Sequence, residues 1–116
     1  MWINPYDAQV YELSLFLSYT KIVIDTRVYR RHPDMSEELI LNACKRIIQF
    51  GYREPPGVRY VFASAPIAGE PQIEVIGTLL EDGTFEIFHA MRLREKIAQE
   101  LRLVRSGRNT RSRRRS

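Results

Sequence analysis

The sequence predicts a small α+β domain, in which helices pack on an antiparallel sheet of three to four strands, followed by a disordered basic tail. Three observations predict this fold class. With 116 residues and 44% hydrophobic composition, the chain is long enough for one core. A capped apolar stripe over 34–50 is typical of a helix. Alternating segments on both sides of an Asp-Gly pair predict a hairpin.

Residues 1–20 form an N-terminal extension that has two interpretations. Val10, Leu13 and Leu17 share one face of a helix, whereas every second residue over 11–19 is apolar or aromatic, which is strand spacing. We favour the helix and leave the strand open. The main domain then covers 21–104.

The main domain begins with a predicted strand over 21–29 (KIVIDTRVY), which is rich in β-branched side chains. A helix over 36–49 follows, since Asp34 and Ser36 are both cap-type residues and Glu37 stands three residues after Asp34, as in a capping box. Gly51 is placed to end this helix. Its apolar stripe consists of Ile40, Ala43, Cys44, Ile47 and Ile48.

Three further strands are predicted over 58–64, 72–80 and 84–89, with the turn Glu81-Asp82-Gly83 between the last two. Short connections between successive strands indicate an antiparallel meander. A last helix is expected over 91–104, where the apolar residues Leu93, Ile97, Leu101 and Val104 repeat at helical spacing.

Composition narrows the possible environments and chemistries. A single cysteine, Cys44, excludes an intrachain disulfide and fits a reducing compartment. No apolar run is long enough to span a membrane, and the N-terminus lacks a signal-peptide pattern, so we expect a cytoplasmic protein without a membrane partner. Neither metal-ligand spacing nor a glycine-rich phosphate loop occurs, so we expect no metal and no small-molecule cofactor.

The net charge of +4 is unevenly distributed along the chain. Residues 105–116 hold six of the 18 basic residues and no acid, so 12 basic residues face 14 acids in the rest. Such a segment cannot bury enough to fold alone, and as a flexible arm it would bind RNA or DNA phosphates, or an acidic protein, with little choice of sequence. The alternative is a solubilising end without a partner. The six arginines are Arg105, Arg108, Arg111, Arg113, Arg114 and Arg115.

Two basic clusters are candidates for chemistry. The first contains His89, Arg92, Arg94 and Lys96 at the passage from the last strand to the last helix, and the second contains Arg30, Arg31 and His32. Histidine suits proton transfer at neutral pH, and the arginine fork matches phosphate oxygens. If the clusters meet, they supply what RNA cleavage without a metal needs. Otherwise the basic residues form a solvated surface and the histidines cap carbonyls.

Two stretches resemble a known family. The run RRHPDMSEE, from Arg30, resembles the R-K-H-G-[VI]-S-x-E-[DE] opening of small bacterial toxins of the BrnT kind. The run GTLLEDGTFEIFHAMRLREK resembles their ending, which carries H-A-M-x-x-R-x-K. The resemblance implies a RelE-like fold, metal-independent ribonuclease activity and a cognate antitoxin partner. It points to the positions His32, His89, Arg92, Arg94 and Lys96, with Arg31 in support.

From the clusters and the resemblance, the sequence predicts a toxin of a toxin–antitoxin pair that cleaves RNA by attack of a 2′-hydroxyl. A non-catalytic RNA-binding or protein-interaction module on the same scaffold is the alternative.

Overall fold

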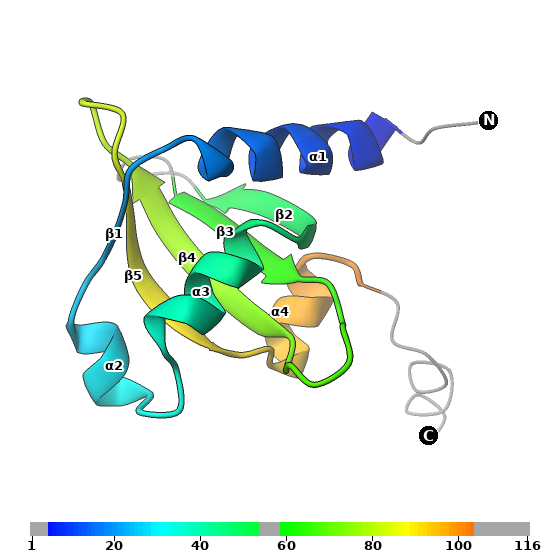
Figure 1. Cartoon of the computed structure of the whole chain (residues 1–116). Coiled ribbons are helices and arrows are strands. Elements are labelled where there is room, and N and C mark those ends of the chain that lie inside the picture. The colour runs from blue at the N-terminus through cyan, green and yellow to red at the C-terminus, as the bar shows by residue number, and fades with distance from the viewer. Residues whose placement is uncertain (1–4, 54–58, 104–116) are drawn as a thin grey trace, which may run out of the picture.

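A computed structural model describes residues 5–53 and 59–103, which form a five-stranded mixed sheet and four helices (Figure 1). The strand order is β1-β5-β4-β3-β2. Strands β2 to β5 form an antiparallel meander, whereas β1 pairs in parallel with β5. The α+β class is confirmed, and the predicted antiparallel sheet of three to four strands agrees in part, because β1 adds a fifth strand in parallel. The strands are β1 (Ile22–Ile24), β2 (Ile47–Arg53), β3 (Arg59–Ser64), β4 (Ile73–Leu79) and β5 (Phe85–Arg92).

The helices cover both faces of this sheet. Helices α1 (Pro5–Ser18) and α3 (Glu37–Cys44) pack with the larger core cluster, which includes Phe62, Val75 and Ile87. Helix α4 (Glu95–Glu100) covers the opposite face, where Ile97 and Leu101 meet Val61, Ala63 and Ile76. Figure 1 shows α3 in front of the sheet and α4 behind it. The central strand β4 is therefore enclosed from both sides.

The strand predicted over 21–29 is much shorter than expected. It ends at Ile24 because Asp25 turns the chain: one Asp25 carboxylate oxygen accepts the backbone N–H of Arg27 at 2.9 Å. The side chain of Arg27 also donates to this carboxylate, and these hydrogen bonds lower the pKa of Asp25 to about 2. Helix α2 (Arg27–Arg31) follows, and Val28 enters the core.

The helix predicted over 36–49 begins as expected but ends early. Ser36 accepts a hydrogen bond from the backbone N–H of Leu39 and caps α3, whose last residue is Cys44. Residues 47–53 instead form the edge strand β2, with Ile47 buried and Ile48 exposed. Two β-branched residues followed by aromatic ones favour a strand. Gly51 therefore lies within a strand and does not end a helix.

The boundary between the last strand and the last helix also differs from the prediction. Strand β5 runs on through Arg92, because Met91 and Arg92 still pair with β4, and α4 covers only Glu95–Glu100. After it, Arg102 adopts a left-handed φ of 60° and the N–H of Leu103 bonds to the carbonyl of Ala98 at 2.8 Å, which closes the helix end. The predicted Asp-Gly hairpin is confirmed, with Gly83 at φ 90°.

At the N-terminus, the structure has the helix of the two interpretations that the sequence left open. Helix α1 contributes Val10 and Leu17 to the same core as the sheet. The predicted disordered tail over 105–116 lies outside the described residues. Within 5–53 and 59–103, no helix has the length and apolar character needed to cross a membrane.

Gly77 supplies a test of this packing. A Cβ atom on Gly77 would lie 2.6 Å from the ring of Phe85 and 2.8 Å from the carbonyl oxygen of Glu86. Gly77→Ala should therefore destabilise the protein by about 1–3 kcal/mol, measured by denaturant unfolding. Gly51→Ala is the matched control, since its Cβ would meet only a leucine methyl at 3.4 Å. Equal stability of both variants would contradict this description of the β4–β5 contact.

Candidate functional site

A buried carboxylate, Glu74 of β4, lies at the centre of the candidate site. Glu74 pairs with Ala63 on one side and Met91 on the other, while Ile76 pairs with His89. Because paired residues share a sheet face and side chains alternate along a strand, Glu74 and His89 point to the same face. This is the face covered by α4, and Glu74 is fully buried there.

Among the described residues, the Glu74 side chain hydrogen-bonds to two predicted site residues, His89 and Arg94. Its Oε2 lies 2.8 Å from Nε2 of His89. The same oxygen accepts from the Arg94 guanidinium, at 2.9 Å from Nε and 2.6 Å from Nη2. Its Oε1 accepts the backbone N–H of Arg94 at 2.8 Å. Glu74 thus connects the end of β5 to the start of α4.

The charge on Glu74 is maintained by these partners. Burial is the largest influence and raises the pKa of this carboxyl, but the hydrogen bonds from His89 and Arg94 together outweigh it, so its pKa lies below the usual value. Glu74 is therefore ionised at neutral pH and acts only as an acceptor.

The second predicted cluster meets the first at this point. His32 follows the last turn of α2, and its backbone is held on both sides: its N–H donates to Val28 and its carbonyl accepts from Met35, each at 2.9 Å. Its ring contacts that of His89 edge to face, with 5.9 Å between ring centroids and 85° between planes. Two histidines separated by 57 positions in the sequence thus form one pair.

The remaining cations differ in how they are engaged. Arg92 makes an exposed ion pair with Asp34, at 3.3 Å between Nε and Oδ2. Arg30 and Arg31 lie exposed in the last turn of α2, and Lys96 lies exposed on α4. The arginines predicted to bind RNA between Arg105 and Arg115 fall outside the described residues. Positive charge at the site thus consists of the half-buried Arg94 guanidinium and of exposed cations on β5, α2 and α4.

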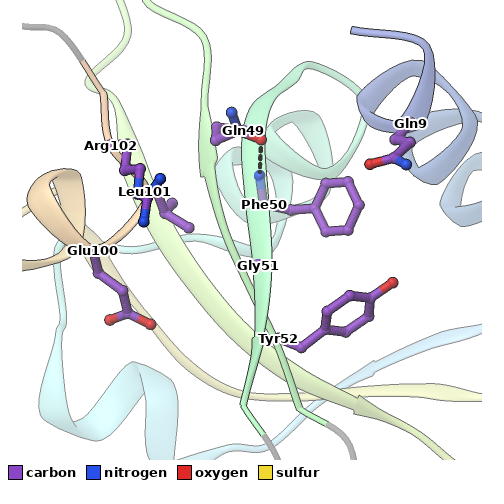
Figure 2. A pocket seen from close by; sticks show the side chains of 8 residues that line it. All are labelled: Gln9, Gln49, Phe50, Gly51, Tyr52, Glu100, Leu101 and Arg102. Atoms are coloured by element: carbon purple, nitrogen blue, oxygen red, sulfur yellow. Dashed lines mark hydrogen bonds between the residues drawn. The ribbon is translucent and has the colours of Figure 1, made fainter. Parts of the chain in front are cut away.

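A separate hollow lies at the β2 edge, two strands away from β4. Figure 2 shows Phe50 and Tyr52 on one side of β2 and Glu100, Leu101 and Arg102 on the other. This hollow brings together no histidine and no buried charge. Among the described residues, no group of three or more His, Cys, Asp or Glu side chains could hold a metal ion. The histidine pair is thus the better candidate site.

Sequence reasoning missed Glu74 as a functional residue. In Gln72-Ile73-Glu74-Val75-Ile76 it has the position of a polar residue on the solvated face of an alternating strand. The signal that could have found it is topological: where helices cover both faces of a sheet, a charged residue in a central strand has no solvent to face.

Comparison of the chain with protein-family models, with curated proteins and with solved structures found no match. We therefore infer the function from the geometry of the histidine site.

The lowered pKa of Glu74 predicts how stability depends on pH. Because the folded protein holds this pKa below the ordinary glutamate value of 4.5, the unfolded chain binds the proton more readily, so stability should fall as the pH drops below about 4.5. Glu74→Gln should show a shallower fall, measured as the free energy of unfolding between pH 6 and pH 2. Asp25 and Asp82 are present in both proteins, so parallel curves would contradict the lowered pKa.

Proposed function

We propose that this chain is a toxin-like ribonuclease that cleaves RNA without a metal, with His32 and His89 as the proton-transfer pair. The observation that carries the proposal is the contact between the two rings, 5.9 Å apart between centroids, with the Arg94 guanidinium on the carboxylate oxygen that also contacts His89. Two histidines this close can reach the same substrate group, and histidine changes its protonation near neutral pH. The same proposal includes a cognate antitoxin that binds over the histidine pair.

The reaction is a transfer within the RNA strand. One histidine takes the proton of a 2′-hydroxyl, whose oxygen then attacks the adjacent phosphorus. The other histidine gives a proton to the departing 5′-oxygen, so the P–O5′ bond breaks as the P–O2′ bond forms. The products are a 2′,3′-cyclic phosphate and a 5′-hydroxyl, and no external reactant is consumed. Arg92 and Lys96 would balance the negative charge that grows on the phosphoryl oxygens. Arg30 and Arg31 would bind phosphates of the RNA strand.

One observation favours the alternative, a protein-interaction module. Helix α1 and the residue that follows it leave four large apolar or aromatic side chains exposed, and the edge strand β2 adds two more. Clustered exposed apolar residues of this kind mark contact surfaces for other proteins. They are Tyr11, Leu15, Phe16 and Tyr19 of the α1 region, where Tyr19 is 86% exposed, and Ile48 and Tyr52 of β2. The same surface would also suit a protein that regulates the ribonuclease. What separates the two candidate functions is therefore whether the histidine pair cleaves RNA.

The test is a cleavage assay of purified protein on a labelled RNA in EDTA. We expect cleavage that leaves a 2′,3′-cyclic phosphate, and we expect His32→Ala or His89→Ala to reduce the rate by about 100- to 10,000-fold. Lys45→Ala, which removes an exposed cation next to α3, is the control and should cleave at the wild-type rate.

Two further arms separate the outcomes. An RNA with a single 2′-deoxynucleotide at the cleaved position should stay intact, since the attacking group is missing. Equal activity in all variants would point to a contaminating nuclease and contradict the proposal. Binding of RNA without cleavage would favour the non-catalytic module.

A further inference from the structure

Glu74 is the buried charged group that the proton-transfer scheme above leaves without a role. An ionised carboxylate is expensive to bury, and replacement of a buried ion pair by apolar residues is often neutral or stabilising. Its neighbours on the same sheet face are Ala63 and Ile76, so an apolar residue would suit the packing of this position. The presence of a carboxylate here calls for an explanation other than core stability.

We propose that Glu74 is a positioning residue of the histidine pair: it holds His89 in the Nε2–H form and leaves Nδ1 as the nitrogen that exchanges a proton with substrate. This inference rests on the proposed ribonuclease function for its catalytic part. Its structural part, the choice of tautomer, holds for the free protein and is tested separately.

The geometry carries the assignment in two steps. Because the carboxylate has no proton to donate, the 2.8 Å contact to Nε2 of His89 requires a hydrogen on that nitrogen. Within the described residues, Nδ1 of His89 has no hydrogen-bond partner that would compete for this role. The His89 side chain is 21% exposed, so substrate can reach part of the ring.

Arg94 takes a different role in this arrangement from the one expected from the sequence. Its guanidinium and its backbone N–H both hold the carboxylate of Glu74, which fixes the direction in which the carboxylate faces His89. The order of contacts is then Arg94 to Glu74 to His89 to substrate. A carboxylate clamped in this way keeps the imidazole in one orientation and one tautomer.

The first measurement is a long-range ¹H–¹⁵N spectrum of the histidine rings in the wild-type protein at a pH where the rings are neutral. We expect His89 as the Nε2–H tautomer, with His32 as the comparison within the same spectrum. A predominant Nδ1–H form of His89 would overturn the proposal without any variant, whether or not the protein cleaves RNA.

The second measurement compares Glu74→Gln with Glu86→Gln, which removes another carboxylate on the neighbouring strand β5. A neutral amide oxygen accepts more weakly than a carboxylate oxygen, so Glu74→Gln should raise the fraction of the Nδ1–H form of His89 and lower the cleavage rate by about 10- to 100-fold. Glu86→Gln should change neither. Unfolding curves show that each variant is folded before it is assayed.

The outcomes separate the two claims. A changed tautomer with an unchanged cleavage rate would overturn the positioning role, and an unchanged tautomer would overturn the role of Glu74 in selecting it. If the wild-type protein does not cleave RNA but the tautomer responds to Glu74→Gln, the ribonuclease proposal fails while the control of His89 by Glu74 stands.

Discussion

The burial of the Glu74 carboxylate is the constraint on which the site and the surrounding fold depend. A carboxylate that is enclosed by a sheet and a helix must have its oxygens hydrogen-bonded, or folding loses several kcal/mol. Three partners come from one short stretch: His89 on β5, and the guanidinium and backbone N–H of Arg94. To deliver them, β5 must stay paired with β4 through Arg92 and α4 must start after Arg94. The late start of the last helix thus follows from the needs of one side chain on the neighbouring strand.

The parallel pairing of β1 with β5 brings the other half of the site into place. Ile24 pairs with Ile87, and the N–H of Asp25 donates to the carbonyl of Ile87 at 2.9 Å, so both strands run toward the same end of the sheet. From there β5 reaches His89 two residues later. The turn at Asp25 leads from β1 into α2, and His32 lies at the end of α2. An antiparallel first strand would have carried the chain to the opposite end of the sheet. The mixed sheet is therefore the topological reason that the two histidines meet.

The parts of the fold that the sequence predicted correctly are those with local chemical signals. The Asp82-Gly83 turn requires a positive φ that glycine supplies, and Ser36 offers an oxygen to the first turn of α3. The errors fall where two patterns overlap. Ile47 and Ile48 continue the helical stripe of Ile40 and Cys44, yet they also begin an alternating strand, and pairing with β3 decides between the two. At the site, the two basic clusters were visible in the sequence, whereas Glu74 was not, because its burial depends on contacts between distant strands and helices.

The way in which each arginine is bound indicates which one is available to a phosphate. Removal of the Arg94 guanidinium from Glu74 would leave a buried charge without its main partner, and breaking a buried pair costs about 3–5 kcal/mol, less here because the Arg94 side chain is 38% exposed. The pair of Arg92 with Asp34 is exposed and long, at 3.3 Å, and pairs of this kind contribute only about 0–1 kcal/mol. A phosphate oxygen can therefore replace Asp34 on Arg92 at little cost, whereas it cannot replace Glu74 on Arg94. For the proposed ribonuclease, this difference favours Arg92 for the phosphate contact, with Lys96 nearby in sequence, whereas Arg94 positions Glu74.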